Sequence, residues 1–327
     1  MPIREATPEA IADAASALRR GELVAFPTET VYGLGADATN SRAVARIFEA
    51  KGRPRFNPLI VHVADLAAAE RIAELSGTAK KLAAAFWPGP LTLVLRRKPT
   101  GKISDFVTVG LETVAVRIPS HPTALTLLRE VGLPVAAPSA NRSGHVSPTL
   151  AVHVRDDLGE APAIILDAGP ALHGLESTIL DATGDQIVQL RAGAVPAEAI
   201  EAVVGGPLAR SQSGETGSAD RDESEALIAP GQLASHYAPA APLRLEATSV
   251  EPGEALIAFG GAIPDTSGPV INLSPSGDLV EAAANLFVAL RVLDAAHPRG
   301  IAVMPIPRHG IGEAINDRLG RGAAPRT

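Results

Sequence analysis

The sequence predicts an α/β protein of two domains: a larger domain with a twisted mixed sheet and flanking helices, then a smaller Rossmann-like α/β domain. Three observations predict this architecture. The chain has 327 residues, which is long for one hydrophobic core. Short apolar runs alternate with amphipathic runs, but without the regular spacing of a purely parallel sheet. A stretch rich in Gly, Ser and charge interrupts the pattern at residues 205–225.

The first two hundred residues divide into helices and strands by periodicity and by their boundary residues. Thr7 suits a helix N-cap before a proline, and Gly21 suits the end of that helix. Asn40 or the serine after it begins a second helix that Gly52 ends. Further helices are predicted over 65–75 and 78–87, and strands over 23–28, 58–65, 91–97, 113–119, 133–140, 162–169, 177–183 and 186–195.

A second unit is predicted to begin after the interruption. We expect a larger domain over residues 1–205, a linker or mobile loop over 206–242, and a small α/β domain over 243–327. Prolines in the linker favour an extended path, yet the consecutive His236 and Tyr237 are unusual side chains for a passive spacer. In the small domain, strands are predicted over 254–260 and 300–306, and helices over 278–297 and 311–323.

The composition excludes several classes of protein. There are no cysteines, which removes disulfides, thiolate nucleophiles and cysteine-based zinc sites. No apolar run is long enough to span a bilayer, so we expect a cytoplasmic protein with no membrane partner. The net charge of −7 argues against a surface that tracks nucleic acid, so no stable nucleic-acid complex is expected. Residues 42–142 nevertheless hold 15 Lys and Arg against 7 Asp and Glu, which favours a discrete anion site.

Two clusters in this basic region contain residue types that bind phosphate. Lys51 and Arg53 lie at the end of a predicted helix, where two cations can point the same way. The alternative is a solvated basic cap that complements the helix dipole. Ser139, Asn141 and further hydroxyls crowd the loop after an apolar strand, where hydroxyl and backbone N–H groups commonly bind anions. The alternative there is an ordinary polar surface loop.

Two polar residues interrupt strands that are otherwise apolar. Arg117 needs a partner, because an unpaired buried charge is costly. Its planar fork suits a carboxylate, which either a substrate or an internal Asp or Glu could supply. His62 is either a satisfied core histidine or a polar group at the floor of a pocket. The sequence leaves both questions open.

Several familiar sites are absent. No GxxxxGK[ST] P-loop occurs, GLGADA has too few glycines in phase for the dinucleotide fingerprint, and there is no Gly-x-Ser-x-Gly elbow. The eight histidines show no HxxxH or HExxH spacing, so no metal held by the protein is expected.

Taken in order, the motifs resemble those of the threonylcarbamoyl-AMP synthase family, whose catalytic part is the YrdC-like domain. Any one motif is weak, but the ordered set is specific. The tail from residue 273 resembles the extra C-terminal domain of the long family form, and PGQLASHYAP resembles its linker, so the likeness covers nearly the whole chain. The other matching stretches are PTETVYGLG, KGRPRFNPLIVHV, WPGPLTLVL, VAVRIPSHP, APSANRSGHVSPT and ESTILD.

This resemblance implies a nucleotidyltransferase that combines L-threonine, bicarbonate and ATP into threonylcarbamoyl-adenylate and releases pyrophosphate. The product would serve the N6-threonylcarbamoyladenosine (t6A) modification of tRNA through a separate downstream transferase, the expected partner. Mg²⁺ would be carried by the ATP phosphates, with no tightly bound cofactor. Amine attack on CO₂ or bicarbonate, and carbamate attack on the α-phosphorus, need no protein nucleophile.

The resemblance also implies roles for individual residues. The expected catalytic set is Lys51, Arg53, Ser139 and Asn141. The expected ATP contacts are Arg53, Asn57, Thr113, Ser139, Ser147, Arg191 and Tyr237. The expected L-threonine contacts are Thr30, His62, Arg117, Ala137 and Ser177.

Two other functions stay open. An RNA-binding module acting on tRNA without ATP chemistry would use the basic region directly, but 3% aromatic residues leave few surfaces for base stacking. A carbamoyltransferase that uses carbamoyl phosphate would match the larger hydrogenase-maturation relatives of this domain. Those relatives carry Cys-rich zinc modules, and this chain has no cysteine.

Overall fold

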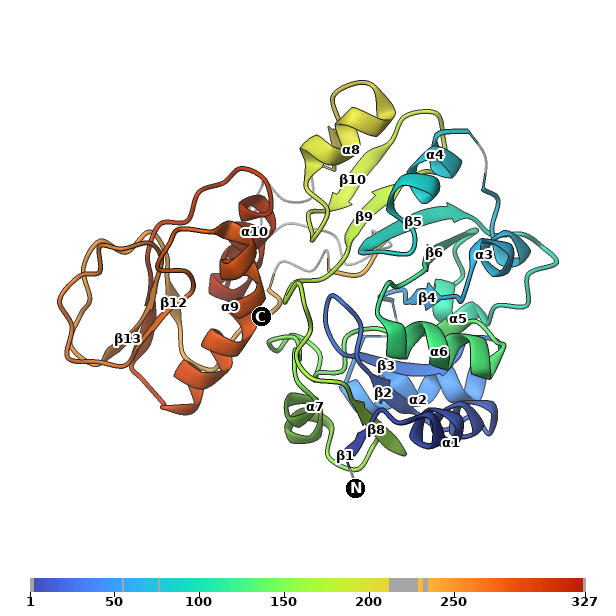
Figure 1. Ribbon diagram of the computed structural model, residues 1–327, viewed down its shortest axis with the longest axis horizontal. Helices are drawn as coiled ribbons and strands as arrows, with labels where there is room; N and C mark the ends of the chain where they lie inside the picture. Colours follow the sequence, from blue (N-terminus) through green and yellow to red (C-terminus); the bar gives the residue numbers. More distant parts are fainter. Residues whose placement is uncertain (1–2, 55, 76, 212–228, 232–234, 326–327) are drawn as a thin grey trace.

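We describe the computed structural model over residues 3–54, 56–75, 77–211, 229–231 and 235–325. The chain forms two sheets with helices around them, and the smaller unit lies beside the larger one (Figure 1). The predicted fold class, a mixed α/β sheet followed by a smaller α/β unit, is confirmed. Most of the predicted linker lies outside the described residues, as does Arg55 of the basic cluster.

The larger sheet has eleven strands that run in mixed directions. Its strands are β1 (Ile3–Glu5), β2 (Val24–Phe26), β3 (Gly33–Asp37), β4 (Ile60–His62), β5 (Leu91–Arg96), β6 (Thr113–Arg117), β7 (Val135–Ala136), β8 (Ile164–Asp167), β9 (Thr178–Asp181), β10 (Val188–Arg191) and β11 (Ala209–Arg210). The spatial order is β1-β8-β2-β3-β7-β4-β6-β5-β9-β10-β11. β2 and β3 are antiparallel, whereas β4 pairs with β6, and β5 with β9, in parallel.

The helices that flank this sheet follow the predicted capping signals where those signals are strongest. The Thr7 hydroxyl accepts a hydrogen bond from the backbone N–H of Ala10 at 3.2 Å. The Asn40 side chain caps the second helix, which ends at Gly52 in the left-handed conformation with φ of 58°. The helices are α1 (Pro8–Arg19), α2 (Ser41–Lys51), α3 (Leu66–Ile72), α4 (Gly77–Phe86), α5 (Asp105–Thr108), α6 (Pro122–Val131), α7 (Ala151–Leu158) and α8 (Ala197–Val204).

The sequence prediction does not include every element, and β3 and α6 are the two omissions that matter most. β3 contains two glycines, which have no side chains and so leave no alternating apolar pattern that would predict a strand. A Cβ on Gly35 would lie 2.8 Å from the Phe26 ring and 3.0 Å from the Val135 side chain, so glycine permits close packing with the neighbouring strands. α6 has the usual boundary signals, a proline in its first turn and Gly132 at its end, which the prediction overlooks.

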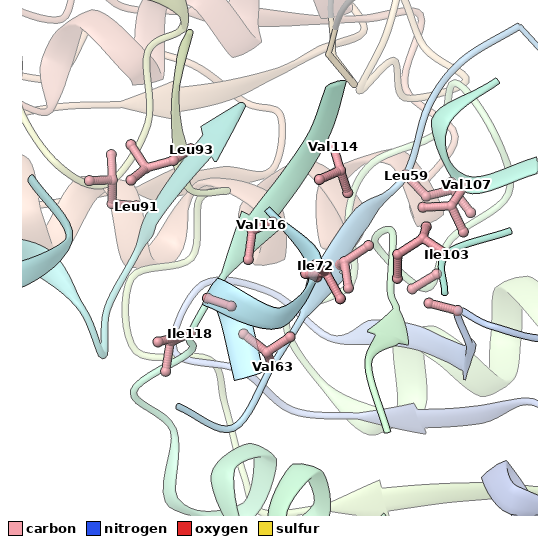
Figure 2. Packing of buried hydrophobic residues seen from close by; sticks show 14 of the residues in the cluster. Leu59, Val63, Ile72, Leu91, Leu93, Ile103, Val107, Val114, Val116 and Ile118 are labelled. Atoms are coloured by element: carbon pink, nitrogen blue, oxygen red, sulfur yellow. The ribbon is translucent and has the colours of Figure 1, made fainter. Parts of the chain in front are cut away.

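The core of the larger unit is aliphatic, as expected for a chain with few aromatic residues. Figure 2 shows how β5, β6 and α3 contribute to it. Leu91 and Leu93 come from β5, Val114 and Val116 from β6, and Ile72 from α3, and all are buried. Because the core packs closely against the sheet, it fixes the strands and therefore the positions of the residues at their ends.

The smaller unit has a parallel sheet of four strands in the order β12-β15-β13-β14. Its elements are β12 (Leu243–Arg244), β13 (Glu254–Ala258), β14 (Val270–Asn272), α9 (Leu279–Ala295), β15 (Gly300–Val303) and α10 (Gly312–Ala323). An apolar stripe runs along α9: Ala283, Leu286, Leu290 and Leu293 are buried, and Leu279 at the start of the helix is half-buried. Among the described residues, no helix is both long and apolar enough to cross a membrane.

The two units meet along α9 and α10, which lie on the side of the small sheet that faces the larger unit (Figure 1). Gly174 packs directly on α9, because a Cβ there would lie 2.5 Å from the Ala283 carbonyl oxygen. Arg291 of α9 forms an ion pair with Asp157 of α7 at 2.6 Å. These contacts bring the smaller unit close to the ends of the larger sheet.

Candidate active site

Polar side chains gather where several strands of the larger sheet end, and they line a cavity that we call the central pocket. β4 and β6 are parallel neighbours whose last residues, His62 and Arg117, pair in register. Both side chains therefore reach the same edge of the sheet. Predicted site residues that line the central pocket are Thr30, Arg53, His62, Arg117, Ala137, Ser139, Ser177, Arg191 and Tyr237.

Arg117 is paired inside the protein. Its Nη2 donates to Glu29 Oε1 at 2.6 Å, its Nη1 donates to Thr30 Oγ1 at 2.9 Å, and its Nε donates to the Gly89 carbonyl. Both charged side chains are 4% exposed. The internal acid that the sequence left open is therefore Glu29, and it supplies the strand's missing partner. A role for Arg117 in threonine binding stays a prediction.

The charges of this pair determine the state of neighbouring groups. Burial alone would raise the pKa of Glu29, but the charge and hydrogen bond of Arg117 outweigh it and lower that pKa to about 2. His62 is buried, and burial together with the Arg117 charge lowers its pKa to about 3, so its ring is neutral. Its Nδ1 has no hydrogen-bond partner among the described residues. His62 is thus a buried neutral side chain at the pocket wall, the second of the two predicted alternatives.

Two further arginines, Arg53 and Arg191, line the central pocket and add positive charge to it. Arg53 donates from Nη2 to the Pro58 carbonyl at 3.0 Å, and Arg191 donates from Nη2 to the Ser177 carbonyl at 2.9 Å. Burial lowers the pKa of Arg53 to about 10, which still leaves it charged at neutral pH. Within the described part of the chain, the recorded bonds of both guanidinium groups go to backbone carbonyls and a hydroxyl, not to a carboxylate.

Lys51 lies behind the pocket wall rather than in its lining. Its Nζ donates to the backbone oxygen of Ser139 at 2.7 Å and to that of Asn141. Burial, and then the charge of Arg53, hold the pKa of Lys51 well below its usual value. In this structure Lys51 therefore fixes the loop that carries Ser139, and its contact with a phosphate stays a prediction.

The other predicted residues outside the lining occupy different places. Asn57 and Asn141 are buried nearby, and each has a side-chain oxygen without a partner among the described residues. Ser147 is also buried, and its hydroxyl donates to Glu176 Oε1 at 2.5 Å. Thr113 is the first residue of β6, whereas Arg117 is the last, so they lie roughly 13 Å apart along the strand.

His236 and Tyr237 close the central pocket from the smaller unit's side. Tyr237 has a φ of 61°, a left-handed conformation that is strained for a non-glycine residue. Its ring lies 4.1 Å from that of His236 and stacks on Phe287 of α9 at 5.8 Å. Burial, and then four surrounding cations, hold the pKa of His236 well below its usual value. Tyr237 therefore lines the central pocket, and its contact with ATP stays a prediction.

The predicted site sets omit several residues that lie in or beside the pocket wall. The Thr28 hydroxyl holds the turn after β2 by donating to the Val31 carbonyl at 2.6 Å. Glu29 and Glu176 are buried acids whose partners come from distant segments, Arg117 and Arg318. The available signal was an acid within each of the motifs PTET and ESTILD, but the sequence does not show which base each acid meets.

The central pocket has a volume of about 50 Å³, and His236 and Tyr237 are among the residues that line it. That volume corresponds to roughly two water molecules. Among the described residues, no group of three or more His, Asp or Glu side chains is arranged to hold a metal ion.

Comparison with known proteins decides the family. A sequence profile of the Sua5/YciO/YrdC family, described as telomere recombination, matches residues 16–193, more than half of the chain. The chain belongs to the Sua5/YciO/YrdC family. A second profile, described as the C-terminal domain of threonylcarbamoyl-AMP synthase, matches residues 195–324. The resemblance inferred from the motifs is confirmed.

Members of this family resemble the chain over nearly its full length. The threonylcarbamoyl-AMP synthase of Bacillus subtilis (strain 168) is 46% identical, over 97% of this chain and 93% of that protein. The threonylcarbamoyl-AMP synthase of Pyrococcus abyssi is 42% identical, over 94% of this chain and 92% of that protein. The crystal structure of P. abyssi Sua5 complexed with L-threonine superposes with a TM-score of 0.86, over 96% of this chain and 94% of that one, at 39% identity.

Replacing Gly193 with alanine is expected to lower stability and disturb the pocket wall. A Cβ at this position would lie 2.3 Å from the backbone nitrogen of Thr178 and 2.5 Å from the carbonyl oxygen of Glu176. Overpacking of this kind costs about 1–3 kcal/mol. Thermal unfolding followed by circular dichroism measures the change. Gly184→Ala is the matched control, because nothing lies within 4 Å of its Cβ position, and an equal melting temperature for both variants would contradict the prediction.

Proposed function

We propose that this chain synthesises threonylcarbamoyl-AMP from L-threonine, bicarbonate and ATP, as a nucleotidyltransferase that releases pyrophosphate for t6A modification of tRNA. One observation carries the proposal. Arg53 and Arg191 are buried at the central pocket with no carboxylate recorded among their partners in the described segments, and Lys51 is buried just behind them. Buried cations without counterions are costly, so this arrangement favours a polyanionic ligand such as a nucleoside triphosphate.

A second group of residues at the pocket, around Arg117, suits a small amino acid. Glu29 Oε2 is a buried acceptor and His62 Nδ1 a buried polar atom, and neither has a hydrogen-bond partner among the described residues. The ammonium or hydroxyl group of threonine would supply donors there, and Arg117 suits the substrate carboxylate. The L-threonine complex of the P. abyssi relative supports this choice of ligand. Thr30, Ala137 and Ser177 would complete the threonine contacts.

An apolar surface between these groups and Thr113 suits the adenine base. Ile60, Ala115 and Leu190 belong to one small buried cluster, in which Ile60 and Ala115 pair on the neighbouring strands β4 and β6 and Leu190 comes from β10. Thr113 lies two residues before Ala115, so its side chain is on the same face of β6. This arrangement supports Thr113 as a contact to the nucleoside and Arg53, Ser139, Ser147 and Arg191 as contacts nearer the phosphates.

The pocket supports a reaction driven by positioning and charge. The threonine amine attacks CO₂ or bicarbonate to form a carbamate, and bicarbonate loses water in this step. A carbamate oxygen then attacks the α-phosphorus of ATP, forming the mixed anhydride as pyrophosphate leaves. Arg53 and the Mg²⁺ carried by the ATP phosphates would neutralise charge on the leaving group. The loop that Lys51 fixes would hold Ser139 and Asn141 in place for the same step.

ATP binding requires His236 and Tyr237 to withdraw, because about 50 Å³ cannot hold a nucleotide and an amino acid. The strained backbone of Tyr237 would be relieved by that movement. Return of the segment would exclude water and protect the carbamate, which hydrolyses readily.

We also propose a cytoplasmic location, a catalytic domain over 1–205 joined through 206–242 to a C-terminal domain over 243–327, and a separate transferase that consumes the product.

Pyrophosphate release from ATP tests the proposal. We expect release to require both L-threonine and bicarbonate, since neither the carbamate nor the anhydride forms without them. The assay is run with each co-substrate omitted in turn, and with L-alanine in place of L-threonine as the control. Release that persists at the full rate without bicarbonate would rule out the carbamate route. Binding of tRNA without any ATP turnover would favour the RNA-binding alternative.

A further inference from the structure

Arg318 of α10 is fully buried at the pocket wall, although it comes from the smaller unit. Its Nε donates to Glu176 Oε2 at 2.7 Å, and its Nη2 donates to the Ala192 carbonyl at 3.0 Å, next to Arg191. Its guanidinium carbon lies 5.0 Å from the centre of the Tyr237 ring, within cation–π range. Its Nη1 also pairs with Asp317 at 2.5 Å, so this one side chain contacts two residues that line the pocket, Glu176 and Tyr237, and two that do not.

The two oxygens of the Glu176 carboxylate accept hydrogen bonds from different units. Oε1 accepts the hydroxyl hydrogen bond of Ser147 at 2.5 Å, and Oε2 accepts from Arg318 at 2.7 Å. Glu176 is only 6% exposed and lines the central pocket. A buried carboxylate beside a site for a polyanion would repel that ligand unless a cation neutralised it.

We propose that Arg318 is a positioning residue for the nucleotide end of the central pocket: it neutralises Glu176 and, through Glu176, orients the hydroxyl of Ser147. This inference rests on the proposed function, because it takes ATP as the anion. Arg318 itself does not line the pocket, so it acts through the groups that do.

The backbone of Ser147 is held from the smaller unit as well. Arg291 of α9 donates from Nη2 to the Val146 carbonyl and, at 3.5 Å from Nε, to the Ser147 carbonyl. The ion pair with Asp157 fixes the same guanidinium. The smaller unit thus restrains Ser147 in two ways. Arg291 binds its main chain directly, and Arg318 fixes the Glu176 carboxylate that accepts the hydrogen bond of its hydroxyl.

Steady-state pyrophosphate release by the full-length chain tests the role of Arg318. We expect Arg318→Met to raise the KM for ATP by roughly 10- to 100-fold, the range for loss of a charge-assisted hydrogen bond. The KM for L-threonine should stay within about threefold of the unchanged protein, because Arg318 contacts none of the expected threonine residues. A defect that was merely structural would change kcat or both KM values together. An unchanged KM for ATP would overturn the proposal.

A double variant separates the charge effect from packing. Glu176→Gln keeps an acceptor for Ser147 but removes the negative charge, so adding Arg318→Met in that background should change the KM for ATP by less than about threefold. A further tenfold rise in that background would show that Arg318 does not act through Glu176. This comparison stays decisive even if Arg318→Met alone does not fold, because the double variant contains no unpaired carboxylate.

Arg210→Gln is the matched control. Arg210 of β11 pairs with Glu313 of α10, the helix that carries Arg318, so this ion pair also joins the two units. Neither residue lines the central pocket. Both KM values should match those of the unchanged protein. A wild-type chain that shows no threonine-dependent release would contradict the proposed function, whereas an active wild type with an unaltered Arg318→Met variant would contradict this inference alone.

Discussion

Replacing Arg53 with alanine is expected to lower kcat/KM for ATP by about 10²- to 10³-fold, the usual effect of removing one preorganised charge or donor at a site of developing negative charge. Arg53 is 8% exposed, and its guanidinium donates to the Asn57 and Pro58 carbonyls, so it is already oriented before substrate binds. Its pKa of about 10 keeps the charge in place at neutral pH. Loss of that charge removes stabilisation of the leaving pyrophosphate.

Pyrophosphate release at varied ATP concentration measures this effect. Arg42→Ala is the matched control, because Arg42 lies on the exposed face at the start of α2, the helix that ends two residues before Arg53. A control variant with full activity excludes a general effect of removing positive charge near α2. Full activity in Arg53→Ala would place the phosphates elsewhere and would remove the main support for the proposed function.

Replacing Arg117 with alanine is expected to destabilise the fold by about 3–5 kcal/mol, because it leaves Glu29 as a buried carboxylate without its partner. The same change should raise the KM for L-threonine, since the pocket loses the side chain expected to bind the substrate carboxylate. Guanidinium-chloride unfolding measures the first effect, and threonine-dependent pyrophosphate release measures the second. Arg4→Gln, which breaks the exposed pair with Asp13, should change stability by less than about 1 kcal/mol.

The stability effect of Arg117→Ala should depend on pH in a defined direction. The pKa of Glu29 falls from its ordinary value of 4.5 to about 2 in the folded protein, so its contribution is present above pH 4.5 and is lost as pH falls toward 2. This shift corresponds to roughly 3 kcal/mol. The difference in stability between the variant and the unchanged protein should therefore be large at pH 7 and smaller at pH 3. A difference that stays constant over this range would mean that Glu29 is not the linked group.

Features with local causes could be predicted from the sequence. Thr7, Asn40 and Gly52 bound the first two long helices because capping depends on residues within one turn. The apolar stripe of α9 needs no knowledge of its neighbours, because periodicity alone marks the buried face. β3 was beyond this kind of reasoning, since its glycines are explained only by Phe26 and Val135 on adjacent strands.

The sequence by itself determined the family, the fold class and most of the side chains that line the central pocket, because these are carried by ordered motifs and local patterns. The tertiary structure alone decided which groups meet. It paired Arg117 with Glu29, directed Lys51 to the loop behind the pocket, and brought Arg318 to Glu176 across the boundary between the units. Such partners depend on strand order and on contacts between residues more than eighty positions apart, which no local pattern records.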